Sequence, residues 1–323
     1  MSKNLNQLWS QNVVERLVSM GIDTFYLSPG LRNTPLIWAI KNCSQAKYYL
    51  GFDERGQSYR ALGAAKVLSK PVVLVCTSGS ALANFFPAVV EAFHSRHPLL
   101  IISADRPVDL MWAQDNQTCE QERFYGSYCE AHLDLPAPNE QISLEALDLK
   151  LHHFFSHFTD RPAHLNMRFR EPLLEVSEGS DFQLPARLRQ APVKRTLSEE
   201  DKLGIQEKIN AAKKPLLVFG ELKLELKLDN LNLPLLSDVT SSYQSHLPSF
   251  DCSFTQNWMK NYRPDLVIHI GGKLTSKYYY QWKQQHKVET LTLKENTDLD
   301  DPSFALQHLF CSENIEDYMF LLG

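Results

Sequence analysis

One short stretch of the sequence places acidic and basic side chains where two patterns meet. Asp53 and Glu54 directly follow an apolar run at 47–52, and Arg55 begins an alanine- and leucine-rich segment at 55–69. The first run is typical of a buried strand and the second of a helix. An acid at this junction can simply interact with the helix dipole. It can also be a catalytic carboxylate, and the pattern by itself allows both roles.

Three further segments, at 28–36, 77–92 and 103–121, combine turn residues with polar or charged side chains after a short apolar run. In an open parallel sheet, the carboxyl ends of the strands meet in one crevice. Each segment also has an ordinary structural explanation, because glycine-rich turns are common in α/β proteins and an arginine such as Arg32 or Arg106 is usually solvated or paired. Four such loops after four strands together indicate a binding site.

The elements that must position these loops alternate along the chain. Runs typical of buried strands are separated by helical patterns, and they lie at 23–30, 47–52, 71–80 and 98–107. After a polar, proline-containing linker at 176–201, apolar runs followed by small-residue turns return at 214–221, 233–242 and 264–277. Continuous apolar strands that alternate with helices are typical of parallel sheets covered on both faces. The sequence predicts an α/β protein with two doubly wound parallel-sheet domains, at 1–175 and 202–323.

Composition excludes several classes of protein. The formal net charge of −5 lacks the basic excess that non-specific nucleic-acid binding needs. The six cysteines are scattered without a CxxC pair, so neither a zinc site nor a disulfide framework is indicated. The N-terminal stretch has no basic segment followed by an apolar core, and no run is long enough to span a membrane. We expect a cytoplasmic protein without nucleic-acid or membrane partners and without metal ligands of its own.

Several motifs together resemble one enzyme family. They are SPGLRNTPL, FDERGQSYRALGAAK, NQTCEQ, RPAHLNMRFREPL and the long segment from PVVLVCTSGS to IISADRP. These resemble the pyrimidine-binding domain of the MenD family of menaquinone biosynthesis, and PDLVIHIGGKLTSKYYYQW resembles the family's central, transhydrogenase-like domain. The family uses thiamine diphosphate and Mg²⁺ to decarboxylate 2-oxoglutarate, and it adds the succinyl unit to isochorismate. The resemblance implies the same cofactors and substrates here.

The resemblance also implies roles for individual residues. Glu54 matches the glutamate that hydrogen-bonds N1′ of the cofactor's aminopyrimidine, and the other cofactor contacts are Pro29, Ser78 and Gly79. The positions that match substrate-binding residues are Arg32, Arg106, Asn116, Gln117 and Lys277. Arginine suits these substrates because its planar fork can bind a carboxylate through two hydrogen bonds.

The first domain departs from the family pattern in two loops. Leu31 and Asn33 stand where the family has small hydroxyl residues, and Leu31 removes a hydrogen-bonding group beside Arg32. Gly56 and Gln57 change the entrance of the following helix, and Arg60 stands where an aromatic or apolar residue is usual. These changes put substrate binding in question rather than the fold.

Two further departures concern the rest of the chain. Tyr278 replaces an arginine beside Lys277, and no GDG motif follows. In the family, that motif belongs to a third domain that holds the metal and the diphosphate, so we expect this domain to be absent and the chain alone to be inactive. Three hypotheses remain: part of a MenD-type synthase, one subunit of a split thiamine diphosphate enzyme, or a non-catalytic binding or regulatory relative. We expect a homo-oligomer or a complex with a diphosphate-domain partner.

Overall fold

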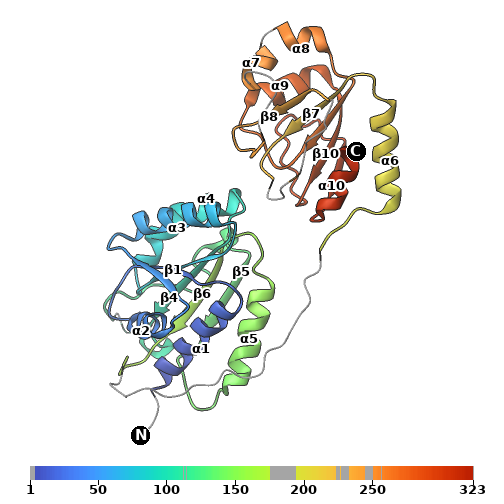
Figure 1. Ribbon diagram of the computed structural model, residues 1–323. Coiled ribbons are helices and arrows are strands. Elements are labelled where there is room, and N and C mark those ends of the chain that lie inside the picture. The colour runs from blue at the N-terminus through green and yellow to red at the C-terminus, as the bar shows by residue number, and fades with distance from the viewer. Residues whose placement is uncertain are drawn as a thin grey trace. The chain divides into compact units, whose positions relative to one another are not determined.

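The computed structural model describes residues 4–111, 113, 115–174, 194–222, 226, 233–243, 250–255 and 257–322. The chain divides into two compact units, Met1–Arg189 and Gln190–Gly323, each built on one sheet (Figure 1). This division lies inside the segment predicted as a linker. Residues 176–193 of that segment lie outside the described residues, and helix α6 begins at Glu199.

The sheet of the first unit has six parallel strands in the order β2-β1-β3-β4-β6-β5. Their bounds are Thr24–Leu27 for β1, Lys47–Leu50 for β2, Val72–Cys76 for β3, Leu99–Asp105 for β4, Ala131–Leu135 for β5 and Ala163–Arg168 for β6. The strand order reverses between β1 and β3, and Leu27 pairs with Val75 in this register. The loops that leave these two strands therefore open at a topological switch point, where ligands of such sheets bind.

Helices cover both faces of this sheet (Figure 1). Helices α1 (Leu5–Ser19), α2 (Thr34–Asn42) and α5 (Leu144–Ser156) pack on one face, and α3 (Glu54–Leu68) and α4 (Ala81–His94) pack on the other. Alternation along β3 explains how one strand serves both cores, because Val73 and Val75 face the first group while Leu74 and Cys76 face the second. Two short 3₁₀ helices, Val108–Leu110 and Gly126–Tyr128, lie between β4 and β5.

The second unit has a parallel sheet of five strands in the order β11-β10-β9-β7-β8. The strands are β7 Pro215–Phe219, β8 Leu235–Ser237, β9 Leu266–Ile270, β10 Glu289–Lys294 and β11 His308–Cys311. The helices are α6 Glu199–Ala211, α7 Phe250–Thr255, α8 Asn257–Tyr262, α9 Lys277–His286 and α10 Ile315–Leu322. Apolar cores lie on both faces of this sheet. The prediction of two doubly wound parallel-sheet domains is confirmed.

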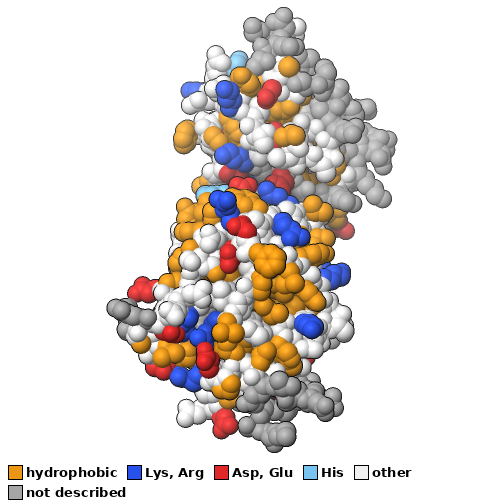
Figure 2. All heavy atoms as spheres, turned by 90° about the vertical axis from the view of Figure 1, so that its left-hand side faces the viewer, with side chains coloured by type: hydrophobic (Ala, Val, Ile, Leu, Met, Phe, Trp, Pro, Cys, Tyr) orange, Lys and Arg blue, Asp and Glu red, His pale blue; other side chains and the backbone are white. Residues whose placement is uncertain are grey.

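Strand β2 forms one edge of the first sheet and leaves apolar side chains in solvent. Tyr48, Tyr49 and Leu50 are exposed, and so is Phe52 just beyond the strand. Figure 2 shows hydrophobic side chains gathered over the first unit on the side that faces left in Figure 1. An exposed edge strand with apolar side chains is a surface on which another chain can pack. Among the described residues, no helix is both long and apolar enough to cross a bilayer.

Candidate active site

Arg106 connects two of the loops predicted from the sequence, 77–92 and 103–121. Its guanidinium group donates from Nη1 to Ser78 Oγ at 2.6 Å and to the backbone oxygen of Gln117 at 3.0 Å. The residue is only 5% exposed. The structure therefore brings Ser78, Arg106 and Gln117 together at the carboxyl ends of β3 and β4.

Gly79 allows these loops to approach closely. Its φ of +80° is in the left-handed region, and a β-carbon there would lie 2.8 Å from the backbone oxygen of Gln117. Its N–H donates to Gln121 Oε1 at 2.8 Å. A β-carbon on Gly30, directly after Pro29, would lie 2.5 Å from Cβ of Thr77. Glycine is required at 79 because its backbone passes directly against that of Gln117, and at 30 because the turn lies against the Thr77 side chain.

Arg32 is buried near Arg106. Its Nη1 donates to the backbone oxygen of Phe169 at 3.1 Å, and its Nη2 lies 3.4 Å from Glu171 Oε1. Burial, and after it the positive charge of Arg106, lowers the pKa of Arg32. Two buried guanidinium groups of like charge make the carboxyl ends of β1 and β4 attractive to a carboxylate.

Asp115 is a member of this site that the sequence analysis missed. Its Oδ2 accepts a hydrogen bond from Arg106 Nε at 2.5 Å, and the bond from this guanidinium holds the pKa of Asp115 below its usual value. Its Oδ1 accepts from the N–H of Asn116 at 2.9 Å. The sequence signal was an acid nine residues after Arg106 in the same loop, but a loop without periodicity does not reveal which residues meet.

Two of the predicted substrate-binding residues make fewer contacts. Asn116 is exposed on the loop beside Asp115. Lys277 begins α9 in the second unit, where its exposed Nζ lies 5.3 Å from the ring centroid of Tyr278. A role for Lys277 at the same substrate therefore stays a prediction.

Glu54 is the first residue of α3 and is half-buried. Asp53 caps the helix, since its side chain accepts from the N–H of Gly56 at 2.5 Å. Among the described residues, the Glu54 carboxylate has no hydrogen bond and no ion pair. It lies close enough to Cys76, the last residue of β3, for its charge to add to burial in raising the pKa of that thiol. The capping role thus belongs to Asp53, and the carboxylate of Glu54 is available.

Gln57 ties the start of α3 to the sheet. Its Nε2 donates to the backbone oxygen of Tyr49 at 2.5 Å and, more weakly, to that of Leu27 at 3.5 Å, while its Oε1 accepts from Arg60 at 2.9 Å. The side chain is 2% exposed. The departure from the family pattern at Gln57 therefore places a buried amide at the carboxyl ends of β1 and β2, one turn after Glu54.

The departures in the first loop have different structural consequences. Asn33 is buried and holds the loop closed, because its amide donates to the backbone oxygen of Ser28 at 3.0 Å and accepts from the N–H of Gly30 at 2.9 Å. Leu31 is 76% exposed beside Arg32. The loop is thus well ordered by its own hydrogen bonds, and Leu31 presents an apolar surface where the family has a hydroxyl group.

A buried polar network holds the backbone of Arg106. Asn166 donates to Asp105 Oδ2 at 2.9 Å, and Arg168 lies 3.1 Å from the same carboxylate. Burial raises the pKa of Asp105 against these interactions. Ser103 Oγ lies 2.7 Å from His164 Nε2, and burial lowers the pKa of His164 to about 3, so this imidazole is neutral. The network borders a polar cavity of about 190 Å³ that is also lined by His132 and Asp134.

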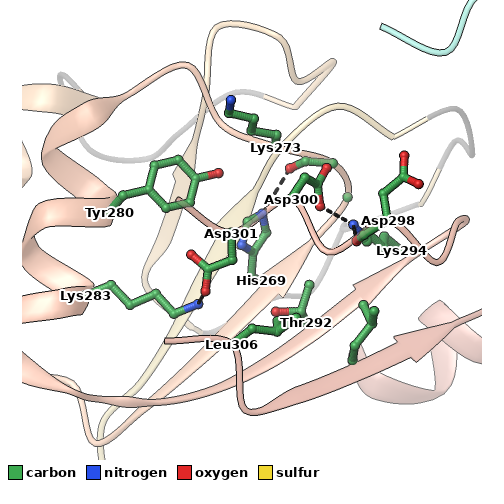
Figure 3. Close-up of a pocket in the computed structure, with 13 residues that line it drawn as sticks. His269, Lys273, Tyr280, Lys283, Thr292, Lys294, Asp298, Asp300, Asp301 and Leu306 are labelled. Carbon is green, nitrogen blue, oxygen red and sulfur yellow. Dashed lines mark hydrogen bonds and ion pairs between the residues drawn. The ribbon is translucent and has the colours of Figure 1, made fainter. Parts of the chain in front are cut away.

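The second unit has a small hollow at the carboxyl ends of β9 and β10 (Figure 3). In the close-up, Lys283 points to Asp301, with 2.9 Å between Nζ and Oδ2, and Lys294 points to Asp300. Both lysines are buried. The hollow measures only about 20 Å³. Because its two buried lysines are already paired and its volume is that of about one water, we interpret it as a structural ion-pair cluster.

The comparisons with known proteins agree with this geometry. Residues 9–123 match the family model described as "Thiamine pyrophosphate enzyme, N-terminal TPP binding domain". Relatives named 2-succinyl-5-enolpyruvyl-6-hydroxy-3-cyclohexene-1-carboxylate synthase are 34% identical in Pelodictyon phaeoclathratiforme and 35% identical in Syntrophus aciditrophicus, over 89% and 94% of this chain. The chain belongs to this family of thiamine pyrophosphate enzymes. The resemblance drawn from the motifs is confirmed.

The chain spans about half the length of these MenD relatives, 53% and 57%. Solved structures show the same fold. Benzoylformate decarboxylase from Polynucleobacter necessarius has a TM-score of 0.66 at 14% identity, over 97% of this chain and 60% of its own. A putative thiamin diphosphate-dependent enzyme isolated from Mycobacterium smegmatis has a TM-score of 0.65 at 16% identity, over 97% and 62%.

The residues of the first unit fit the pyrimidine end of thiamine diphosphate. The unpartnered Glu54 carboxylate can hydrogen-bond a ring nitrogen, and the turns at Gly30 and Gly79 leave no room for a β-carbon. In the described part of the chain, no group of three or more His, Cys, Asp or Glu side chains could hold a metal ion. The fit of Glu54 concerns the aminopyrimidine ring.

Proposed function

We propose that this MenD-family chain supplies the pyrimidine-binding part of a synthase that decarboxylates 2-oxoglutarate and adds the succinyl unit to isochorismate. The observation that carries the proposal is the half-buried carboxylate of Glu54, which has no partner among the described residues and begins the helix that follows β2. Buried arginines at 32 and 106 follow β1 and β4, the two strands on either side of β3 in the same sheet.

Glu54 would act through one proton. When bound, thiamine diphosphate supplies the electron sink that decarboxylation of a 2-oxo acid needs. The carboxyl group of Glu54 would hold a proton shared with ring nitrogen N1′ of the aminopyrimidine. Gln57 fixes the first turn of α3 and so the position of this carboxyl group. Pro29, Ser78 and Gly79 form the surrounding loops.

The arginines would bind and orient the substrates. Arg32 and Arg106 carry fixed positive charge in a partly dry crevice, where a hydrogen bond to a carboxylate is stronger than in water. We propose that they hold carboxylates of 2-oxoglutarate and isochorismate. Asn116, Gln117 and Lys277 are proposed as additional contacts.

We place Mg²⁺ and the diphosphate with the half of the relatives' length that this chain does not span. We further propose that the chain functions in the cytoplasm as a homo-oligomer, or with a partner that carries a diphosphate-binding domain. The exposed apolar edge at β2 supports an interface of this kind. The division of roles at residues 1–175 and 202–323 is part of the same proposal.

Glu54→Gln tests the function. The assay measures turnover of 2-oxoglutarate by residues 1–323, alone and mixed with the C-terminal half of the Syntrophus relative. Because glutamine can hydrogen-bond but cannot share an ionisable proton, we expect activity to decrease about 10²–10⁴-fold. Glu91→Gln removes an exposed acid of α4 and should change activity less than about twofold.

The other outcomes discriminate among the alternatives. Arg32→Ala should raise KM more than it lowers kcat, because it removes a carboxylate contact rather than a proton transfer. If Glu54→Gln turns over as fast as the parent, Glu54 is only a helix-start acid and the proposal is wrong. Absence of turnover in every preparation would favour a non-catalytic relative.

A further inference from the structure

We infer that Asp115 is a specificity-determining residue whose own carboxylate occupies the anion position at Arg106. The inference rests on the proposed function in one respect, namely that Arg106 faces a substrate carboxylate. It adds that an incoming anion must exchange with a carboxylate of the chain itself. Asp115 therefore sets how tightly a carboxylate is held at this position.

The hydrogen bonds of Arg106 show which edge of its guanidinium group is involved. Nη1 is engaged with Ser78 Oγ and with the backbone oxygen of Gln117, and both of these acceptors are fixed parts of the loops. Nε donates to Asp115 Oδ2 at 2.5 Å, and Nη2 has no acceptor among the described residues. A carboxylate that binds an arginine through two parallel hydrogen bonds uses neighbouring nitrogens such as Nε and Nη2. Asp115 thus occupies Nε, one of the two donors that an external carboxylate needs.

Asp115 is placed so that it can give way. Its side chain is 37% exposed, whereas that of Arg106 is 6% exposed. Its other oxygen is held by the N–H of the adjacent Asn116. The cation is therefore the fixed member of the pair, and the carboxylate lies on the side open to solvent. An arriving anion meets the negative charge of Asp115 before it reaches the guanidinium.

Arg32 has no equivalent occupant among the described residues. Its nearest carboxylate oxygen there, on Glu171, lies 3.4 Å away on a side chain that is 68% exposed. This contact is long for a charge-assisted hydrogen bond, which is typically about 2.7–2.9 Å. The two arginines that the sequence suggested as equivalent carboxylate ligands therefore differ. Arg32 is open to an anion, whereas the charge of Arg106 is already paired with that of Asp115.

Asp115→Asn tests the inference by direct binding. The asparagine keeps the shape of the loop and removes its charge, so we expect residues 1–323 to bind 2-oxoglutarate, or succinate as a simpler dicarboxylate, about 5- to 10-fold more tightly. Titration calorimetry at low salt measures the dissociation constants of both ligands. Asp109→Asn is the matched control, because Asp109 lies in the same segment but pairs with Arg170, and it should change the affinity less than about twofold.

A double variant identifies the site of the gain. Arg106→Ala combined with Asp115→Asn should lose the tighter binding. An affinity of Asp115→Asn that is equal to or weaker than that of the parent, including no measurable binding, would overturn the inference, as would a gain that persists without Arg106. These titrations need no turnover. They can therefore fail while the Glu54 assay succeeds, or succeed while the Glu54 assay fails.

Discussion

A β-carbon on Gly79 would lie 2.8 Å from the backbone oxygen of Gln117, although the two residues belong to loops after different strands. The same oxygen accepts a hydrogen bond from Arg106. The close approach of Gly79 therefore fixes the position of the loop whose Gln117 carbonyl accepts from the buried guanidinium of Arg106. A change at Gly79 is expected to act on the crevice as well as on stability.

Gly79→Ala should destabilise the first unit by about 1–3 kcal/mol, because alanine at a φ of +80° is strained and its methyl group would displace the Gln117 backbone. Urea denaturation measures the free energy of unfolding. Gly63→Ala is the control: Gly63 is an exposed residue inside α3, the space that a methyl group would take there is open, and alanine should stabilise by about 0.5–1 kcal/mol. Equal effects of the two substitutions would contradict the close approach.

Gln57→Ala should lower the free energy of unfolding by about 1–3 kcal/mol, since it removes the buried amide that donates to the Tyr49 carbonyl. Arg55→Ala, an exposed position in the same turn of α3, should stay within about 0.5 kcal/mol. Denaturation of both variants under identical conditions makes the comparison. A Gln57 variant as stable as the parent would show that the amide is not needed to join α3 to the sheet.

His164 should make the first unit less stable in acid. Its folded-state pKa of about 3 is below the ordinary value of 6.5, so the unfolded chain binds a proton that the folded chain does not between these values. Stability therefore decreases as the pH falls from about 6.5, by at most about 1.4 kcal/mol per pH unit. His164→Gln should flatten this dependence, while His94→Gln on the surface should not. The measurement is the unfolding free energy between pH 7 and pH 5, and an unchanged slope would contradict the assignment.

Lys283→Met should destabilise the second unit by about 3–5 kcal/mol, because it leaves Asp301, whose side chain is 9% exposed, without its cation. Burial raises the pKa of Asp301, but hydrogen bonds from Ser303 and Lys283 outweigh it and the net pKa is lowered. The pair's contribution is accordingly present above the ordinary pKa of an aspartate and lost below it. Adding Asp301→Asn should recover part of the loss, and Lys273→Met, at an exposed lysine of the same hollow, should cost little. Thermal and urea unfolding decide between these outcomes.

Self-association should depend on the exposed edge of the first sheet. Leu50→Ser is expected to weaken it, because this side chain is 58% exposed on strand β2. Leu149→Ser removes a similarly exposed leucine of α5 and should have no effect. Sedimentation over a range of concentrations measures the association. If the chain stays monomeric at high concentration and no partner is recovered with it from extract, the interface at β2 is contradicted.

The local pattern of the sequence was sufficient for the main elements of the site. Strands β1 to β4 and the helices that follow them are marked by continuous apolar runs and by helical periodicity, and these signals depend only on neighbouring residues. The position of Glu54 at the start of α3 follows from the same patterns. Strand β6 was not predicted, because its buried residues include His164, Asn166 and Arg168, whose polarity is compensated by partners on β4 and β5.

The contacts that define the crevice were decided by tertiary structure. Gln57 reads as an ordinary polar residue of a first helical turn, and it is buried only because the ends of β1 and β2 bring their backbone oxygens to it. The pairing of Arg106 with Asp115 arises in a loop whose path is set by Gly79 and Gln121 rather than by periodicity. A sequence states which charges and donors are available. Which of them meet depends on how separate strands align their carboxyl ends, since hydrogen bonds act only over about 3 Å.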